Sequence, residues 1–284
     1  MTDPSYDTPP RHTAALEARL RNIANARGAN ALRLRSTVAN AIVAQMLPPG
    51  VVKGGTAMKL RVGEAGSRFT PDFDAARAVN VTVDDYIDDF AGRLTAGWHG
   101  FTGRIVRLEP ADPPDVPAEY VMQPFAVKLA YQSRPWLTIE FELGHDELGS
   151  TTTPTFAMAA ELVALFRQFG FPDPAPVAVL AVEHQIAQKL HACTTANRHG
   201  GNDRAHDLVD LQILAETDPP DLGALADIGQ RLFNARRIAP WPPTVRSFPG
   251  WEEIYTRAAE GLDTRPLTDA IDWANQLIAQ ATSR

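Results

Sequence analysis

The sequence predicts an α+β (α/β) protein in two parts, an N-terminal α/β half over residues 1–150 and a helical C-terminal half over residues 151–284. Two observations predict this division. Apolar runs and alternation typical of strands lie before residue 144, whereas apolar residues at helical spacing dominate after residue 155. The intervening "GHDELGSTTTPT" carries neither pattern. With 284 residues and 44% hydrophobic content, the chain can fill one large core or two modest ones.

The N-terminal half is expected to begin with two amphipathic helices, over residues 12–28 and 31–47. "LPPG" ends the second helix, and the apolar "VVK" predicts a strand that runs directly into a Gly-Gly turn. The elements predicted next are a helix over 56–62, a strand over 71–81, a helix over 83–97, a strand over 101–108, a proline-rich surface loop over 109–119 and a hairpin over 125–143.

The C-terminal half is expected to consist of helices joined by short loops. The rigid "APWPPTVRSFPG" connector interrupts them. The predicted helices cover residues 156–169, 183–198, 204–216, 222–236, 251–261 and 266–282.

Composition excludes several classes of protein. The net charge of −7 and pI near 5.5 do not indicate a general nucleic-acid binder, so such binding would need a local basic patch. No apolar run has the roughly 18 residues of a membrane span, and the start lacks the pattern of a secretion signal, so we expect a cytoplasmic protein without a membrane partner. The single cysteine, Cys193, excludes an internal disulfide and suits a buried apolar position.

The stretch "VVKGGTAMKL" predicts a phosphate cradle. Glycine N–H groups can approach a phosphate because no Cβ obstructs them, and a following helix adds its positive end. Gly54 and Gly55 occupy these positions, and Thr56 adds a hydroxyl. Alone, a Gly-Gly pair is most often a plain turn.

Asp72 and Asp74 alternate with Phe73 on the next predicted strand, so both carboxylates project from one face. Because like charges repel there, a divalent cation is the natural partner, and Mg²⁺ commonly joins two carboxylates to the phosphates of a nucleoside triphosphate. Glu142, preferred over Glu140, is predicted as the third acid. An Asp-x-Asp pair alone is most often a solvated edge, and its combination with the glycine turn favours a nucleotide site.

The helical half adds a second charged group. Asp207 and Asp210 share the apolar arc of their predicted helix, which we expect Asn202 to cap, and buried carboxylates need partners such as Lys189, Arg204 or His206. A structural ion network, or a surface Lys189, explains the pattern about as well as function does. The functional interpretation is that Lys189 binds the triphosphate while Asp210 orients it or accepts a proton.

Three segments together resemble the AbiEii-type nucleotidyltransferase toxins, and most closely the mycobacterial MenT group. They are "KGGTAMKLRVGEAGSRFTPDFD", "QIAQKLHA" followed by "NDRAHDLVDL", and "PWPP…W…Y". The resemblance covers most of the chain. It implies a DNA-polymerase-β-like nucleotidyltransferase core with a mixed sheet, joined to a helical domain.

The resemblance also implies roles for individual residues. Asp72 and Asp74 match the metal carboxylates, Lys189 the nucleotide-binding lysine and Asp210 the acid of the last motif, while Thr70 stands where a hydroxyl residue precedes the first acid. Arg204 joins the expected nucleotide-binding set, with Lys59, Arg68 and Asp207 in support. Toxins of this group add nucleotides, often pyrimidines, to the 3′ acceptor end of tRNA and are neutralised by a cognate antitoxin.

Two features depart from the family pattern. The spacing from glycine to aspartate exceeds that of shorter nucleotidyltransferases, as a loop insertion would, and Thr70 replaces the serine of a close relative, which leaves open any control by modification of that hydroxyl. An acidic protein can still bind tRNA if its basic side chains line one cleft. About half of the basic side chains concerned would ordinarily be solvated charges on the surface instead. The basic residues concerned are Lys53, Lys59, Arg61, Arg68, Arg198, Arg204, Arg231, Arg236 and Arg237.

We therefore expect a monomeric, Mg²⁺-dependent enzyme that transfers a nucleotide from an NTP to the tRNA acceptor stem. One alternative is transfer to a protein hydroxyl, in the antitoxin or in the chain itself, which would label protein rather than RNA. A second is an inactive transferase fold that only binds nucleotide or antitoxin, which would bind NTP without releasing pyrophosphate.

Overall fold

The computed structural model describes residues 4–110, 122–197 and 199–283, and these divide into two compact units. Unit 1 comprises residues 1–64 and 69–179, and unit 2 comprises residues 65–68 and 180–284. The chain therefore enters unit 2 for four residues, returns to unit 1, and enters unit 2 again after Val179.

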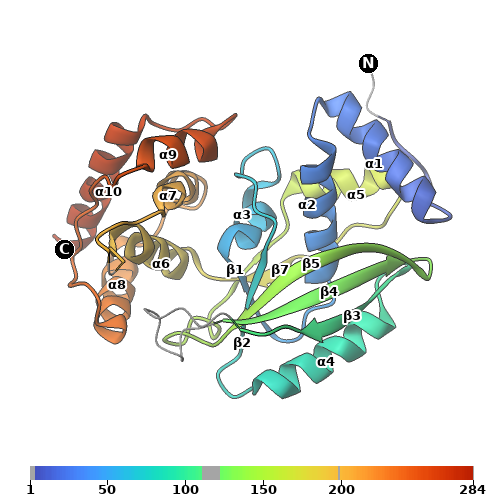
Figure 1. The fold of residues 1–284 in the computed structure, drawn as a ribbon, viewed down its shortest axis with the longest axis horizontal. Helices are drawn as coiled ribbons and strands as arrows, with labels where there is room; N and C mark the ends of the chain where they lie inside the picture. Colours follow the sequence, from blue (N-terminus) through green and yellow to red (C-terminus); the bar gives the residue numbers. More distant parts are fainter. Residues whose placement is uncertain (1–3, 111–121, 198, 284) are drawn as a thin grey trace. The chain divides into compact units, whose positions relative to one another are not determined.

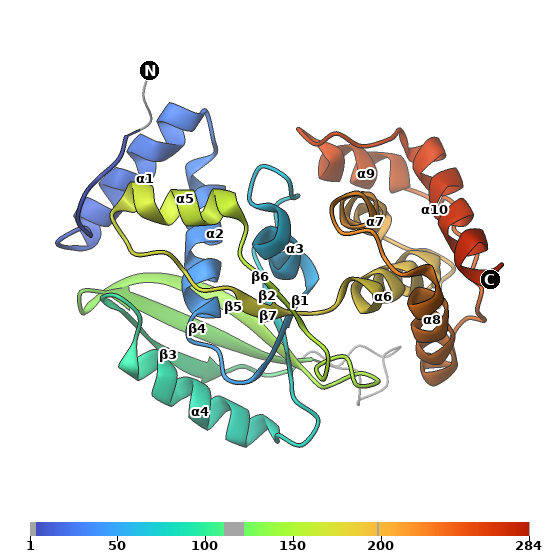
Figure 2. The same ribbon diagram turned by 180° about the vertical axis from the view of Figure 1, so that it is seen from behind.

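In the described residues, unit 1 is built on a mixed sheet of seven strands in the order β3-β4-β5-β2-β1-β7-β6, whose labels can be followed in Figure 1 and Figure 2. β2 pairs parallel with β5 and β1 parallel with β7, whereas the other neighbours are antiparallel. The strands are β1 (Gly50–Lys53), β2 (Phe73–Arg77), β3 (Phe101–Arg107), β4 (Gln123–Tyr131), β5 (Arg134–Gly144), β6 (Thr155–Ala157) and β7 (Val177–Val179).

Within the described part of unit 1, five helices accompany this sheet, and their apolar faces join one core with it. Phe90 of α4 packs on Phe141, whose ring also meets Phe73 of the neighbouring strand. In Figure 1 the β4–β5 hairpin lies in front of α2, and in the reverse view of Figure 2 it lies behind that helix. The helices are α1 (Thr13–Arg27), α2 (Ala31–Ala44), α3 (Gly54–Val62), α4 (Val83–Ala96) and α5 (Ala160–Phe169).

Side-chain alternation gives the β3-β4-β5 part of the sheet one apolar and one exposed face. Phe125, Val127 and Leu129 of β4 are buried, whereas Lys128 is exposed, and on β5 Ile139 and Phe141 are buried on either side of the exposed Glu140. The predicted alternation of the hairpin is therefore confirmed.

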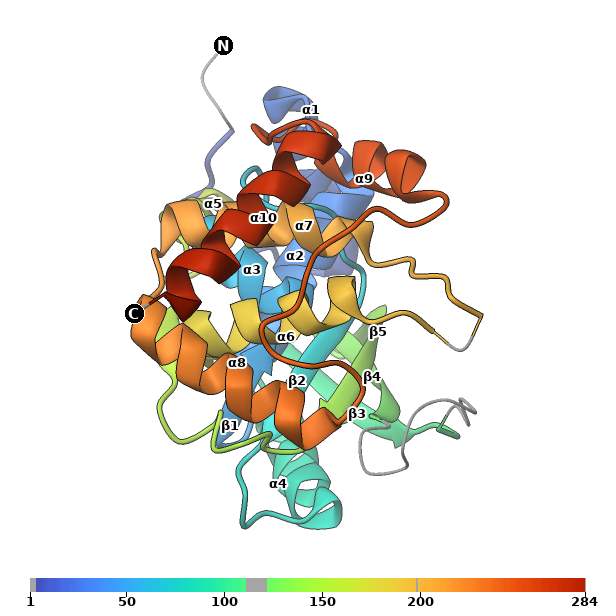
Figure 3. The ribbon, with the colours of Figure 1, turned by 90° about the vertical axis from the view of Figure 1, so that its left-hand side faces the viewer.

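Unit 2 is a set of helices around a second core. α6 packs between α7 and α8, and α10 lies across α7 and α8, as Figure 3 shows. The helices are α6 (Val182–Thr194), α7 (Ala205–Thr217), α8 (Leu222–Arg236), α9 (Trp251–Ala259) and α10 (Leu267–Thr282). Among the helices of the described residues, none combines the length and apolar composition that crossing a membrane requires.

The structure differs from the sequence prediction in three places. The compact units divide after Val179 rather than at residue 150, because β7 pairs with β1 and carries the intervening segment into unit 1. Residues 155–157 form strand β6 instead of starting a helix. The predicted cap is also wrong: Arg204 is the N-cap of α7, while Asn202 accepts a hydrogen bond from the Arg204 N–H at 2.7 Å.

Most of the proline-rich loop predicted over 109–119 lies outside the described residues.

Candidate active site

The glycine pair starts α3 and lets two side chains approach the backbone closely. Gly54 adopts a left-handed conformation with φ of 62°, and a Cβ there would overlap the carboxylate of Asp74. A Cβ on Gly55 would lie 2.5–2.9 Å from three atoms of the Thr70 side chain. Lys53, the N-cap residue, makes no side-chain capping bond to the first turn of α3. The predicted strand and helix are confirmed, but the two glycines form the start of α3 rather than a separate turn before it.

Strand register places three charged residues side by side across unit 1. Lys53 of β1 pairs with Asp74 of β2, and Asp74 pairs with Glu142 of β5. Lys53 reaches over β2, because a Cβ on Gly144 of β5 would lie 3.1 Å from its Nζ. We call this group the acid row: it consists of the three acids Asp72, Asp74 and Glu142 together with Lys53, which lies beside Asp74.

Asp72 immediately precedes β2 and is held by a buried contact with α3. The Thr56 hydroxyl, which is buried, donates to the Asp72 carbonyl at 2.8 Å. The Asn40 amide donates to the same hydroxyl at 3.4 Å. The Thr56 side chain thus joins α3 to the residue that bears the first acid.

The electrostatics of the acid row suit a cation. Burial raises the pKa of Glu142, and the carboxylates of Asp74 and then Asp72 raise it further, while Lys53 opposes them. Among the described residues, no three His, Cys, Asp or Glu side chains are gathered so as to hold a metal ion by themselves. Mg²⁺ usually takes one or two carboxylates and completes its shell with water and substrate phosphates, so these acids fit it in that mode.

Unit 2 holds the second predicted group as a buried chain of ion pairs. Lys189 Nζ donates to Asp207 Oδ1 at 2.8 Å and to Asp210 Oδ2 at 2.6 Å. Arg68 Nε lies 3.0 Å from both oxygens of Asp210, and Arg204 Nε donates to Asp207 Oδ2 at 2.8 Å. The expectation that the two acids meet cations is confirmed, and only 7% of Lys189 is exposed, so its interpretation as a surface lysine is wrong.

These contacts hold Lys189 and Asp207 in their charged forms. Burial alone would lower the pKa of Lys189, but Asp207 and Asp210 raise it above its usual value. Burial would likewise raise the pKa of Asp207, but Lys189 and Arg204 bring it well below the usual range. Lys189 therefore remains an ammonium at neutral pH. Asp210 has both oxygens engaged, which suits orienting a lysine better than accepting a proton.

Lys59, expected to support nucleotide or RNA binding, is instead a buried structural cation. Only 2% of Lys59 is exposed, and its Nζ lies 3.1 Å from Glu64 and 3.4 Å from the Thr70 carbonyl. Thr37 and Arg33 also donate to Glu64. Lys59 is thus excluded from the expected RNA cleft, and its contacts fasten the loop that bears Thr70.

The predicted residues therefore fall into two groups, each assembled within its own unit. Gly54, Gly55, Thr70 and the acid row lie in unit 1, and the Lys189 network lies in unit 2. The sequence analysis did not predict that Lys53 lies beside Asp74. The feature that could have indicated a role for Lys53 is its position directly before the glycine pair. Of the other basic residues, Arg68 and Arg204 are ion-paired, and Arg198 lies outside the described residues.

Comparison with known proteins places this arrangement in context. A family model for the nucleotidyl transferase AbiEii toxin of a type IV toxin–antitoxin system matches residues 38–277. The fold is similar to that of MenT4, a nucleotidyltransferase toxin from Mycobacterium tuberculosis H37Rv, with a TM-score of 0.51 and 16% identity over 94% of this chain and 98% of that one. No curated protein sequence matches the chain. The predicted fold class is confirmed by this likeness together with the mixed sheet.

Proposed function

The chain belongs to the AbiEii family of nucleotidyltransferase toxins, and from this premise we propose that it transfers a nucleotide from an NTP to the 3′ acceptor end of tRNA. The observation that carries the proposal is the acid row beside the glycine start of α3. The transfer would block translation. As a toxin of this family the chain has a cognate antitoxin, and we propose that it acts as a monomer with a pyrimidine nucleotide as donor.

In this proposal unit 1 supplies the phosphate and metal contacts. The N–H groups of Gly54, Gly55 and Thr56 begin α3, so their partial positive charge suits the triphosphate. The backbone of Thr56 serves here, because its hydroxyl is already donated to Asp72. Asp72 and Asp74 would hold Mg²⁺, with the charge of Glu142 beside them, and the bound ion would neutralise charge on the phosphates.

We also propose Lys189 and Arg204 of unit 2 as nucleotide-binding residues, because the buried ion pairs keep the Lys189 ammonium charged. Asp210 and Asp207 would orient Lys189 rather than contact the substrate.

The reaction is an in-line displacement at the α-phosphorus. The 3′-hydroxyl oxygen of the RNA forms a bond to this phosphorus while the bond to the oxygen bridging to the β-phosphate breaks, and pyrophosphate leaves. The hydroxyl proton passes to a carboxylate of the acid row.

The test is incubation of the purified protein with Mg²⁺, total RNA and each α-labelled NTP in turn. We expect label in RNA that ribonuclease removes and protease does not, and we expect a chelator to abolish it. Asp72→Asn and Lys189→Met should each lower incorporation at least about a hundredfold. Asp88→Asn, the same change as Asp72→Asn at an exposed position of α4, should leave it unchanged.

The outcome also separates the alternatives. Label that survives ribonuclease and migrates with protein would establish transfer to a protein hydroxyl. NTP binding without pyrophosphate release, with every RNA supplied, would establish a binding module and overturn the proposal.

A further inference from the structure

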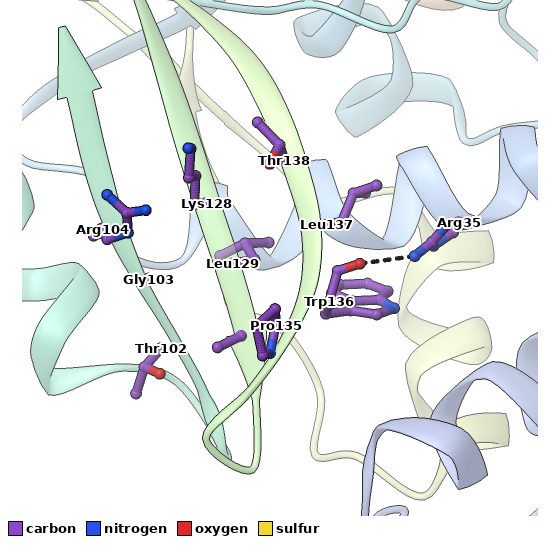
Figure 4. A pocket seen from close by; sticks show the side chains of 11 residues that line it. Arg35, Thr102, Gly103, Arg104, Lys128, Leu129, Pro135, Trp136, Leu137 and Thr138 are labelled. Atoms are coloured by element: carbon purple, nitrogen blue, oxygen red, sulfur yellow. Dashed lines mark hydrogen bonds between the residues drawn. The ribbon is translucent and has the colours of Figure 1, made fainter.

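Unit 1 contains a basic pocket that is separate from the acid row. It has a volume of about 560 Å³ and lies on β3, β4 and β5, beside α2 (Figure 4). Thr102, Thr138 and Pro135 contribute to its lining, and Arg35, Arg104 and Lys128 supply three cations. None of the described residues that line it is acidic. The volume is in the range of pockets that bind molecules of nucleotide size.

Two of these cations are placed in opposition. Arg104 of β3 and Lys128 of β4 are direct register partners, and both are exposed. Like charges opposite each other on neighbouring strands destabilise a sheet. Within the described part of the chain, neither side chain forms an ion pair with an acid. Arg35 differs, because it pairs with Glu17 at 3.0 Å and donates to the Trp136 carbonyl at 2.8 Å. Arg104 and Lys128 therefore favour an anionic ligand.

The pocket and the acid row occupy the same exposed face of the sheet. Lys128 pairs with Thr138 of β5, which precedes Glu142 by four residues, or roughly 13 Å along a strand. On this face, β5 carries Glu140 between Thr138 and Glu142. The residue of β4 that pairs with Glu140 is Ala126, and the residue that pairs with Glu142 is Pro124. An RNA backbone that follows β4 from Lys128 to Pro124 therefore meets no acid on that strand.

We propose that Arg104 and Lys128 bind a backbone phosphate of the acceptor RNA, so that the strand lies along β4 and its 3′ end reaches the acid row. This inference rests on the proposed function and adds an RNA-positioning site to it. Charge complementarity supports RNA as the occupant, because the chain as a whole carries a net charge of −7 and this pocket presents cations alone. Two cations that span neighbouring strands match the several oxygens of a phosphodiester.

The test compares the full-length wild type with Arg104→Gln/Lys128→Gln in two assays. In nucleotide incorporation, the variant should raise the KM for unfractionated tRNA roughly tenfold, as expected from loss of two phosphate contacts, and keep kcat and the KM for NTP within about twofold. In fluorescence anisotropy with labelled tRNA and no NTP, the slope of log affinity against log salt should become shallower by about 1 for each contact. Thermal melting should show equal or greater stability, because the opposed charges are removed.

The matched control is Arg11→Gln/Arg21→Gln, which removes two exposed cations at and near α1. An equal loss of tRNA affinity in the control, or a wild-type KM and salt slope in the pocket variant, overturns the proposal. So does a pocket variant that keeps tRNA affinity but loses binding to the antitoxin. If the wild type labels no RNA, the proposed function fails, and the anisotropy assay still decides the pocket: unchanged binding by the pocket variant refutes it, and weakened binding supports it.

Discussion

The carboxylate of Asp74 lies directly against the α-carbon of Gly54, in space that any Cβ would fill. Glycine is therefore required at position 54 for two reasons, its left-handed φ of 62° and the close approach of Asp74. The absence of a Cβ lets the Asp74 carboxylate lie against the first turn of α3, to which Gly54 contributes its backbone N–H. This contact makes the glycine pair and the acid row one structural unit.

Gly54→Ala is expected to displace Asp74 and to strain the backbone. The left-handed conformation costs a non-glycine residue about 1–2 kcal/mol, and the overlap with the carboxylate adds to this. Incorporation should fall at least about tenfold even at temperatures where the variant is folded, as judged by circular dichroism.

Gly92→Ala is the matched control for that substitution. Gly92 lies in α4, and a Cβ there meets nothing within 4 Å. Because alanine favours a helix over glycine, this variant should be more stable by about 0.5–1 kcal/mol and fully active. Similar losses of activity in both variants would contradict the role assigned to Gly54.

Glu142→Gln is expected to stabilise the protein without metal and to weaken its response to Mg²⁺. The pKa of Glu142 is raised by burial and by Asp74 and Asp72, so folding stability falls as the pH rises from the ordinary pKa of a glutamate to the raised folded value, and the loss is complete above it. Melting in a chelator at pH 8 should show a higher Tm than wild type. Added Mg²⁺ at ten times its Kd should stabilise the wild type by about 1.4 kcal/mol and the variant by less. A lower Tm in the chelator would refute this account.

Lys189→Met should lower stability as well as activity. It removes the central cation between Asp207 and Asp210, both fully buried, and breaking such pairs costs about 3–5 kcal/mol. Urea unfolding measures this cost.

The triple variant Lys189→Met/Asp207→Asn/Asp210→Asn distinguishes an effect of the network on folding stability from an effect on catalysis. Neutral side chains remove the uncompensated buried charges, so we expect most of the lost stability to return while incorporation remains absent. Recovery of activity together with stability would assign the network a purely structural role.

Acid unfolding should report on Asp207. Its folded pKa lies well below the usual value, with Lys189 and then Arg204 as the cause, so its contribution to stability is complete above the unfolded pKa of about 4 and disappears as the pH falls through the folded value. Asp207→Asn should therefore be clearly less stable than wild type at pH 6, and the difference should narrow below about pH 4. A constant difference in urea unfolding from pH 6 to pH 3 would exclude this linkage.

Local patterns were sufficient to predict much of this structure. Apolar spacing located all ten helices of the described residues to within a few residues, and the buried Asp207 and Asp210 required cations whatever the fold. The alternation along β5 indicated that Glu142 faces away from the core.

Features that depend on long-range pairing were not predictable in this way. The row from Lys53 to Asp74 to Glu142 requires the strand order, and the opposition of Arg104 and Lys128 requires the register of β3 on β4. The burial of Lys59 depends in a related way on Thr37 of α2, which meets it from 22 residues away, together with Glu64 just beyond the end of α3. The compact units place residues 151–179 with unit 1, and this placement depends on the pairing of β7 with β1.

Residues 65–68 belong to unit 2 although they lie in the sequence between two segments of unit 1. The backbone therefore passes between the units three times, and cutting the chain at one place cannot yield either unit complete. A fragment that starts at Leu180 would lack Arg68 and leave Asp210 with Lys189 as its sole cationic neighbour among the pairs seen here. Fragments cut at Leu180 should therefore express poorly, whereas a circularly permuted chain, or a co-expressed pair of fragments, that keeps residues 65–68 with the C-terminal part should give a soluble product.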